Sequence, residues 1–313
     1  MDLLRDIENV LLSGGISFRS ESFAGVPSIV CHLVDGLEKV ILPIEIIATS
    51  MSEAANQQSL MLRAIDDIKS SCFNSPIIIT EDRWLCNRSV MSERLLAHLG
   101  IFTSVFARNC IVDKVSAIMA ASFLERTHSY GDAKSRYHYG IFHKGKLVAI
   151  AEFSSPRRWN KTINDSGSLA PINERIVSSY EWVRYASLPG VRVIGGMGKV
   201  LKYFINEKQP DDVMSYADLE WSEGGAYRAL GFQAEGSRMP VAFEIGPDWR
   251  RHALALDKLG LSGDRNSQSA VTCGKVLSSD VAVQAFDSIS SQHKKYFLNF
   301  GSVKYRLKLT DYK

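Results

Sequence analysis

The chain has 313 residues, of which 45% are hydrophobic and 23% charged, and its formal net charge is +3. Such a composition is ordinary for a folded globular protein, and the length exceeds that of one typical domain, so we expect two domains or one enlarged domain. So small a positive excess permits contact with nucleic acid or acidic ligands without predicting it. No stretch approaches the roughly 20 apolar residues of a membrane span.

The cysteines are spaced widely and never form a Cys-x-x-Cys pair, which favours separate buried thiols in a reducing compartment over a disulfide framework or a zinc site. They are Cys31, Cys72, Cys86, Cys110 and Cys273. The chain begins with the acidic Asp2, Asp6 and Glu8, which is not typical of a signal or transit peptide. The sequence therefore predicts a cytoplasmic protein that holds no metal and meets no membrane.

The N-terminal third is predicted to form a small α/β domain. Its hydrophobic periodicity indicates a helix over 2–12, strands over 28–34 and 40–47 joined by the hairpin signal Asp35-Gly36, a helix over 53–71, a strand over 77–80, a helix over 89–99 and a strand over 103–106. This order resembles the restriction-endonuclease-like fold, especially its Vsr-like branch.

Such nucleases need acidic residues and a lysine on adjacent strands, because carboxylates hold Mg²⁺ and the lysine steadies the attacking water. Asp35 and Glu45 are the candidate acids, but Ile47 stands where the lysine should be. The resemblance therefore implies a degenerate nuclease-like domain over 1–108, used for binding or for stability, with an active nuclease as the alternative.

A glycine-rich turn lies at the centre of the second half of the chain. Val191 to Ile194 is a β-branched run, and Gly195, Gly196 and Gly198 follow it with Lys199 beside them. Apolar residues then recur at helical spacing, so a helix is predicted to begin near residue 197 with its free N–H groups at the turn. Such an N-terminus suits a phosphate group, although a plain structural turn has the same glycines.

The elements around this turn are predicted in a regular order. Before the turn we expect a short strand from residue 110, a helix over 114–124, a hairpin over 139–142 and 147–153, and a polar surface loop over 154–173. After the turn we expect a strand over 212–218, a helix over 223–230, a strand over 241–245, helices over 249–259 and 282–296, and a closing strand over 302–309.

This order resembles the acyl-CoA-binding core of the GNAT acyltransferase superfamily, over about residues 110–245. The loop Val-Ile-Gly-Gly-Met-Gly-Lys at 193–199 and Tyr227 ahead of Gly231-Phe232 carry the resemblance. The family has Gln or Arg where this chain has Val193, which leaves room for a different donor. The run Ser-Tyr-Ala-Asp at 215–218 is similar to the Mom DNA-modification proteins of phages.

The resemblance implies an α/β (α+β) fold class: a GNAT-like mixed sheet flanked by helices over 109–250, preceded by the smaller restriction-endonuclease-like α/β domain. Residues 251–313 are expected to be a C-terminal extension that packs on the core. The implied cofactor is acetyl-CoA or another acyl-CoA, with its pyrophosphate at Gly195, Gly196, Gly198 and Lys199.

The resemblance also implies which side chains carry the chemistry. Acyl transfer to an amine needs a base to take a proton, and the leaving thiolate needs a proton in return. Glu181, on the strand before the turn, is the implied base, and Tyr227 is the implied proton donor. A surface glutamate and a packed aromatic ring are their alternative roles.

Four further side chains are candidates for the same site. Asp218, at the carboxyl end of its strand, and Ser215 are implied to orient the acceptor amine. Arg184 would neutralise an anionic ligand, and His128 would act as a base or contact the substrate. Helix capping is the alternative for Asp218. Positions 181 and 184 face opposite sides of a regular strand, so a shared site requires a β-bulge.

The function predicted from these residues is N-acyl transfer, of an acyl or aminoacyl-like group, to a small-molecule or macromolecular amine. One alternative is Mom-like modification of nucleic-acid bases, with the N-terminal domain binding the polymer. Another is a non-catalytic interaction protein. The sequence has neither a Gly-x-Ser-x-Gly elbow nor a His-Glu-x-x-His motif, which argues against common hydrolases and zinc proteases. The acceptor and the oligomeric state stay open.

Overall fold

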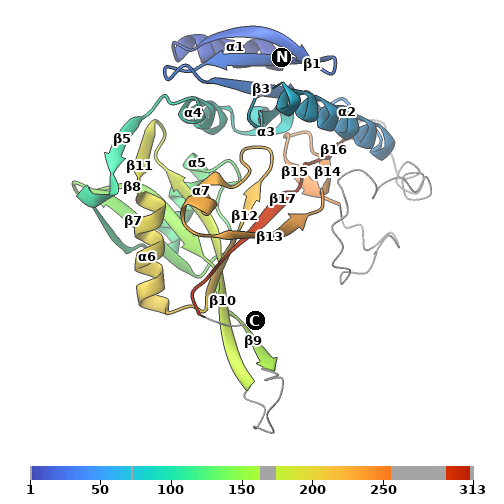
Figure 1. The fold of residues 1–313 in the computed structure, drawn as a ribbon. Coiled ribbons are helices and arrows are strands. Elements are labelled where there is room, and N and C mark those ends of the chain that lie inside the picture. The colour runs from blue at the N-terminus through green and yellow to red at the C-terminus, as the bar shows by residue number, and fades with distance from the viewer. Residues whose placement is uncertain (1, 72, 163–173, 255–293, 311–313) are drawn as a thin grey trace. The chain divides into compact units, whose positions relative to one another are not determined.

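The computed structural model describes residues 2–71, 73–162, 174–254 and 294–310. The chain divides into two compact units, each assembled from separate stretches (Figure 1). The first contains Met1–Ile101, Ala217–Glu223 and Gly236–Val303, and the second contains Phe102–Tyr216, Gly224–Glu235 and Lys304–Lys313. The first stretch of unit 1 ends at residue 101, a few residues before the boundary expected at 108. Residues 217–223 and 236–303 also belong to unit 1.

Unit 1 begins with the order of elements that the sequence predicts, plus a strand and a short helix. The elements are α1 (Leu3–Ser13), β1 (Ser17–Phe23), β2 (Val26–His32), β3 (Glu38–Ile44), α2 (Met51–Ser70), β4 (Ile77–Thr80), α3 (Glu81–Cys86) and α4 (Arg88–His98). They form a sheet of order β1-β2-β3-β4 in which β4 lies parallel to β3 and the other pairs are antiparallel. The added strand β1 has mostly exposed polar side chains, so it shows no apolar alternation in the sequence.

The strands of this sheet place alternate residues on opposite faces. Ile29 and Ile41 pack with the apolar faces of α1 and α4 in one buried cluster. Their neighbours Val30 and Leu42 pack in a second cluster with α2. The continuous apolar runs of β2 and β3 are therefore explained by burial on both faces.

The C-terminal part of unit 1 is a small antiparallel sheet of order β15-β14-β16. Its strands are β14 (Ala242–Ile245), β15 (Arg251–Ala253) and β16 (Lys295–Leu298). The strand predicted over 241–245 is confirmed. The helix predicted over 249–259 is wrong where the structure describes it, because Arg251–Ala253 pairs with β14 instead. The helix predicted over 282–296 lies mostly outside the described residues, and its last positions are strand.

A buried arginine joins the separate stretches of unit 1. Arg251 donates to both carboxylate oxygens of Asp82, at 2.5 and 3.2 Å, and to Thr80 Oγ1 at 2.8 Å. It also donates to Glu220 Oε1 at 2.9 Å. The side chains of Asp82 and Glu220 are fully buried. Burial opposes ionisation of Asp82, but the Arg251 charge holds its pKa below the usual range.

A second arginine completes this charged cluster. Arg83 Nη1 lies 3.1 Å from Asp218 Oδ2 and 3.2 Å from Glu220 Oε2. Burial raises the pKa of the Glu220 carboxyl although both arginines oppose the shift. The cluster thus joins the end of β4, the stretch 217–223 and β15 within one unit.

Unit 2 contains a mixed sheet flanked by helices, which confirms the predicted fold class. Its elements are β5 (Thr103–Phe106), the 3-10 turn η1 (Ala107–Asn109), β6 (Cys110–Lys114), α5 (Ala117–Thr127), β7 (Tyr137–His143), β8 (Lys146–Phe153), β9 (Arg157–Thr162), β10 (Glu174–Ser187), β11 (Val191–Ile194), α6 (Gly196–Lys208), β12 (Asp212–Asp218), α7 (Gly225–Ala229), β13 (Gln233–Arg238) and β17 (Ser302–Lys308). The last residues of β12 and β13 and the first residues of β17 belong to unit 1. The strand order is β13-β17-β12-β10-β8-β7-β6.

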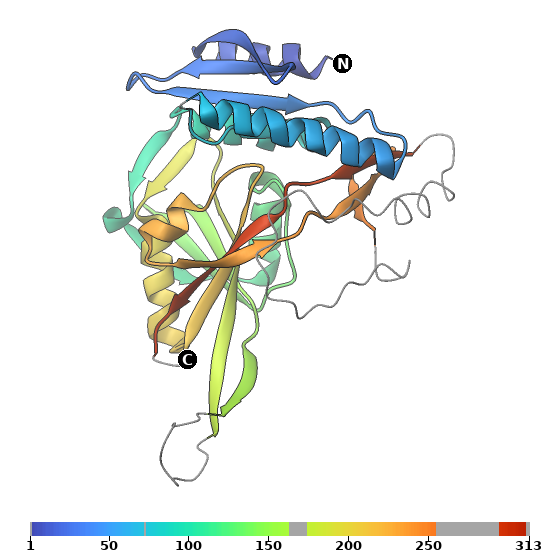
Figure 2. The same ribbon diagram turned by 45° about the vertical axis from the view of Figure 1, so that its right-hand side comes forward.

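The predicted surface loop over 154–173 is partly wrong, because Arg157–Thr162 forms β9. This strand pairs antiparallel with the first half of β10, from Glu174–Thr162 to Ser179–Arg157. In both views the β9–β10 pair extends beyond the other strands of the sheet (Figures 1 and 2). The pairing was hidden in the sequence because β9 is polar and lacks the alternation of a half-buried strand.

The helices α5 and α6 cover opposite faces of this sheet. Ile150 of β8 packs with α5. Phe153 is three residues further on and so faces the opposite side, where it stacks on Phe204 of α6 with ring centroids 3.8 Å apart. The helix α6 runs along its face of the sheet (Figure 1). The two faces are named below by these helices.

Two expectations about the whole chain can be compared with the structure. Cys31 and Cys110 are buried free thiols, but Cys86, the last residue of α3, is exposed, against the prediction. Cys72 and Cys273 lie outside the described residues. Within the described ranges, none of the helices combines the length and the apolar character required to cross a membrane.

We predict that Arg251→Met destabilises the folded chain by about 3–5 kcal/mol, because it leaves the Asp82 and Glu220 carboxylates buried without their partner. Urea unfolding followed by circular dichroism measures the loss. The matched control is Arg250→Met, since Arg250 is exposed and pairs only at the surface with Asp248; its effect should stay within about 1 kcal/mol. Equal losses in the two variants would contradict the structural role of the cluster.

Candidate functional site

The sheet of unit 2 opens between β10 and β12. These two strands pair in parallel only from Ser179–Asp212 to Glu181–Met214. Beyond that point β10 continues its pairing with β8, and the hydroxyl of Ser215 donates to the carbonyl oxygen of Trp182 at 2.9 Å. Where the two strands separate, the Ser215 side chain therefore makes the hydrogen bond to β10 that a backbone N–H of β12 would make in a regular sheet.

A β-bulge lies at the same place on β10. Trp182 pairs with Phe153 and Arg184 with Glu152, so Val183 is an extra residue on β10. One extra residue reverses the alternation of side chains along a strand. The bulge that a shared site of Glu181 and Arg184 requires is therefore present.

Ser215 and Tyr227 are brought together at the opening. Their hydroxyl oxygens lie 2.8 Å apart. Because a carbonyl oxygen can only accept, the Ser215 proton goes to Trp182, and the Tyr227 hydroxyl must donate to Ser215. The ring of Tyr227 stacks on Tyr305 at 5.4 Å, and a Cβ at Gly224, which has φ +80°, would overlap the Tyr305 ring. Packing thus holds the phenol at the opening.

Arg184 is the charged centre on the α5 face. Its guanidinium donates to the carbonyls of Val183 at 3.0 Å and Gly131 at 3.3 Å. Burial lowers the pKa of Arg184, and four acidic groups oppose the shift. They are Glu152, Asp132, Glu181 and Tyr227, in order of effect. Two of the predicted residues therefore lie within the electrostatic reach of Arg184.

Two other predicted side chains have identified partners. The Glu181 carboxylate accepts from Arg157 Nη2 at 3.0 Å, which fixes it beside the start of β9. His128 caps the end of α5, and its Nδ1 accepts from the Tyr130 N–H at 3.1 Å. The Tyr130 ring lies under the Arg184 guanidinium at 5.7 Å, so His128 supports the segment that contacts Arg184.

The glycine turn starts α6 as predicted. Gly195 is the N-cap residue with φ +75°, and the helix begins at Gly196. The first N–H groups of the helix, at residues 196–198, have no carbonyl one turn earlier within it. A Cβ at Gly196 would lie 2.5 Å from Tyr185 Oη and 2.8 Å from Val193 Cγ1. Backbone conformation and internal packing therefore already require these two glycines.

Lys199 points to carbonyl groups of its own unit. Its ammonium donates to the carbonyl of Ala107 at 2.8 Å and also to that of Cys110. The lysine thus holds η1 and the start of β6 against α6. At Gly198 a Cβ would lie 3.3 Å from Leu230 Cδ2, a tight contact with the end of a flexible side chain.

Asp218 belongs to unit 1 and has partners there. One oxygen accepts from Arg83, and the other accepts from the Glu220 N–H at 3.0 Å. Its own carbonyl accepts from the backbone N–H groups of Trp221 and Ser222. These contacts stabilise the turn that follows β12, whereas the helix α7 begins later, with Gly224 as its N-cap.

Sequence reasoning missed Glu152 and its partner His138. Glu152 is fully buried, and His138 Nδ1 lies 2.8 Å from its Oε1. The available signal was one acidic residue inside the apolar run Leu147–Phe153, because a lone charge in a buried strand needs a partner. Its partner, fourteen positions earlier, could not be read from the sequence.

The candidate nuclease acids lie apart in unit 1. Asp35 is in the β2–β3 hairpin turn, where its Oδ1 accepts from the Leu37 N–H at 3.1 Å, and Glu45 is exposed beyond β3. Among the residues that the structure describes, no three His, Cys, Asp or Glu side chains gather as metal ligands would.

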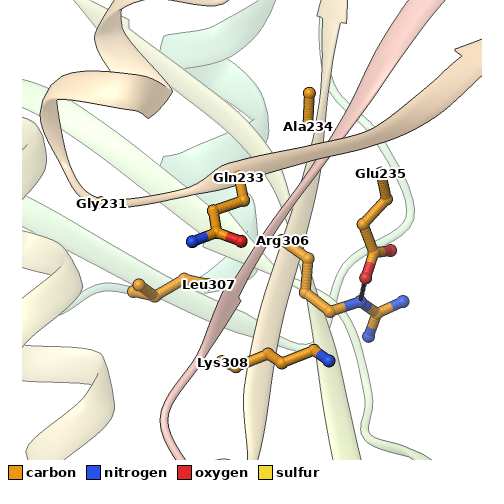
Figure 3. Close-up of a pocket in the computed structure, with 7 residues that line it drawn as sticks. All are labelled: Gly231, Gln233, Ala234, Glu235, Arg306, Leu307 and Lys308. Carbon is orange, nitrogen blue, oxygen red and sulfur yellow. Dashed lines mark hydrogen bonds and ion pairs between the residues drawn. The ribbon is translucent and has the colours of Figure 1, made fainter. Parts of the chain in front are cut away.

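A hollow of about 320 Å³ lies on β13 and β17 and contains none of the predicted site residues. Figure 3 shows its lining: Gly231, Gln233, Ala234, Glu235, Arg306, Leu307 and Lys308. Arg306 donates to Glu235 at 2.7 Å and to the buried Asp212 at 2.5 Å. This arginine therefore links β13, β17 and β12, and the hollow is the surface beside that link.

No protein-family model matches the sequence, and no curated protein matches it. Among solved structures, the chain is similar to a Bacillus subtilis acetyltransferase in complex with CoA, with 9% identity, 64% of this chain and 99% of that chain covered, and a TM-score of 0.32. It is similar to a GNAT family acetyltransferase from Elizabethkingia anophelis with acetyl-CoA bound, with 9% identity, 64% and 99% covered, and a TM-score of 0.29.

An agmatine N-acetyltransferase in its apo form is similar with 11% identity, 64% of this chain and 100% of that chain covered, and a TM-score of 0.29. Similarities this remote assign no role to any residue of this chain. The site is therefore described by its own geometry: an opened sheet, a tyrosine–serine pair at the opening, a helix N-terminus, and charged side chains on the α5 face.

We predict that Gly196→Ala destabilises the chain by about 1–3 kcal/mol, because the new methyl group displaces Tyr185 and Val193. Adding Tyr185→Phe removes the nearer atom and should recover part of the loss in a double-mutant cycle of unfolding free energies. The control is Gly198→Ala, which we expect to be nearly neutral because its Cβ meets Leu230 at 3.3 Å. Equal effects at both glycines would contradict this packing.

Proposed function

We propose that unit 2 is an N-acyltransferase that transfers an acyl group from a CoA-type thioester to an amine. The observation that carries the proposal is the opening of the sheet just after Glu181 and Met214, where Ser215 and Tyr227 form a hydroxyl pair. A gap in the ladder exposes strand backbone inside the sheet, and the adjacent phenol can supply a proton there.

A strip of aromatic rings supports the path of the donor. The Tyr185 hydroxyl lies beside the first helical glycine, Gly196, where an added Cβ would be only 2.5 Å from it. The rings of Tyr185 and Trp182 lie 6.0 Å apart, and those of Trp182 and Tyr227 lie 6.4 Å apart. The strip therefore leads along the α6 face from the helix N-terminus to the opening of the sheet.

The residues at the turn fit a pyrophosphate through backbone groups alone. The free N–H groups at 196–198 and the positive end of the α6 dipole favour an anion. Neither Val193 nor Lys199 adds a charged contact, because valine has no polar group and the lysine ammonium is bound to carbonyls of 107 and 110. The donor site proposed here thus depends on the helix N-terminus.

Within this proposal, the bound thioester supplies the acyl group, and the side chains move protons. Tyr227 gives its proton to the leaving sulfur and is restored by a proton that the amine loses. Glu181, held by Arg157, is the carboxylate predicted from the sequence on the amine side. Asp218, which accepts from Arg83 and from the Glu220 N–H, is assigned no proton transfer. The amine is either a small molecule or the exocyclic amine of a nucleobase, and an acceptor screen with both separates the N-acyltransferase from the Mom-like alternative.

We predict that acetyl-CoA binds the wild-type chain in the micromolar range, about 8 kcal/mol, in calorimetry and native mass spectrometry. Met197→Glu should weaken binding at least about tenfold, because it sets a like charge beside the pyrophosphate at the start of α6. A glutamate in the first turn favours the helix itself, so unfolding does not explain the loss. The matched variant Met197→Gln should bind as the wild type does.

Absence of binding to the wild type would reject the CoA donor and favour a non-catalytic interaction protein. Equal binding by the glutamate and glutamine variants would show that the donor phosphates lie elsewhere. Both outcomes are read from the same titrations.

We predict that Tyr227→Phe lowers kcat about 100-fold or more, as expected for the loss of a general acid, without changing the Kd for acetyl-CoA. The ring stack on Tyr305 is retained, so the fold should be unchanged. Steady-state release of free thiol measures the rate. Tyr203→Phe on α6 is the control, and an unchanged kcat in Tyr227→Phe would remove the phenol from the mechanism.

A further inference from the structure

A carboxylate is buried in the sheet of unit 2 with one oxygen that accepts no hydrogen bond. Glu152 lies on β8 and is fully buried. His138 Nδ1 lies 2.8 Å from Oε1, and Ser135 Oγ lies 3.3 Å from the same nitrogen. Within the described part of the chain, Oε2 has no hydrogen-bond partner. Buried polar atoms are nearly always satisfied, so this oxygen is a candidate to bind a ligand that donates.

Glu152 faces the side of the sheet opposite the proposed donor path. Ile150 packs with α5, and Glu152 is two residues further along the same strand. Its neighbour Phe153 stacks on Trp182 at 5.3 Å, on the α6 face. Donor and acceptor would therefore approach from opposite faces and meet where β10 and β12 separate.

Charged groups from three neighbouring segments lie near this carboxylate. His138 comes from β7, Arg184 lies directly opposite on β10, and Asp132 comes from the segment after α5. Burial raises the pKa of Glu152, Asp132 adds to the shift, and hydrogen bonding to His138 and Ser135 opposes it. A carboxylate whose pKa lies above the usual range takes up a proton more readily at neutral pH.

The segment 130–132, which follows α5, contacts both Arg184 and α5. Arg184 Nε donates to the Gly131 carbonyl at 3.3 Å, and the Asp132 N–H donates to Glu125 Oε1 at 3.1 Å. Gly131 has φ +61° and can change conformation more easily than other residues. Displacement of this segment gives a ligand access to Oε2.

We propose that Glu152, oriented by His138, binds the ammonium group of the acceptor and takes its proton. The inference rests on the acyl transfer proposed above and specifies the acceptor as a primary amine that is cationic in solution. The free Oε2 accepts an N–H of the ammonium group, since an ionised carboxylate has no hydrogen to donate and a charged donor gives the stronger bond. Glu181 then lies at the edge of the site.

The proton and electron balance is complete without a further reactant. The acceptor arrives as an ammonium ion, one N–H bond breaks, and its proton moves to Glu152 Oε2. The nitrogen lone pair forms the C–N bond to the acyl carbon while the C–S bond breaks. The sulfur takes the Tyr227 proton, and the second proton lost by nitrogen restores the phenol. The proton on Glu152 leaves to solvent, so the products are an amide, a thiol and one proton.

Histidine-labelled protein tests the ammonium site without any catalysis. The ring resonances of His138, assigned with His138→Asn, are followed by NMR while n-butylamine is added as its ammonium ion. We expect a saturable shift in the wild type and in Asp113→Asn, an exposed carboxylate control on β6, and no shift in Glu152→Gln. The neutral probe n-butanol should have no effect. No shift in the wild type, or an equal shift in Glu152→Gln, overturns the proposal.

Kinetics with n-butylamine and acetyl-CoA test the proton transfer. Glu152→Gln should lower kcat about 100-fold or more and remove the rise of kcat with pH that reports the carboxylate, while the Kd for acetyl-CoA stays the same. Glu152→Asp should recover part of the rate. Wild-type kcat and an unchanged pH profile in Glu152→Gln overturn the role of this residue.

The two experiments separate the two proposals. If acetyl-CoA fails to bind the wild type but the His138 shift depends on Glu152, the acyltransferase function fails and the ammonium site stands. If acetyl-CoA binds and is consumed at the same rate in Glu152→Gln, the function stands and the role of Glu152 fails.

Discussion

The hydrogen bonds of Arg251 to Asp82, Glu220 and Thr80 are the constraint on which the interleaved structure depends. They join three stretches that lie far apart in the sequence, and all of them are in unit 1. A buried ion pair contributes little net stability compared with apolar packing, but it is strongly unfavourable when one partner is missing. The cluster therefore specifies which stretches belong together, and the chain has no single point that separates its two units.

The geometry of the candidate site follows from a local irregularity in one strand. Val183 is an extra residue in β10, so Glu181 and Arg184 share a face and the ladder to β12 ends after Met214. The separated strands leave backbone groups to be satisfied by side chains, which explains the hydroxyl of Ser215 on the Trp182 carbonyl. Strand irregularities of this kind are frequently found beside functional sites.

Charge on the two faces of this sheet is distributed unequally. The α6 face carries stacked rings such as Phe153 and Phe204, and Lys199 at the start of α6 is bound to carbonyl groups. The α5 face carries Arg184 and the buried Glu152. An apolar face with a helix N-terminus suits a long donor, and a charged face suits a polar acceptor, which is why the proposals assign the two reactants to different sides.

By itself, the sequence determined the elements whose apolar pattern is local. The strands 77–80, 103–106 and 212–218 were predicted with their observed bounds, and the α6 start at the glycine turn was also predicted. Only tertiary structure decided the rest, because the cause lies in distant partners. The stretch at 249–259 has a helical pattern, but Arg251–Ala253 pairs with β14. Asp218 has its partner Arg83 135 positions away, which the sequence could not indicate. Glu152 likewise acquires its partner only when β7 lies beside β8, since periodicity reports burial but not what a buried charge will face.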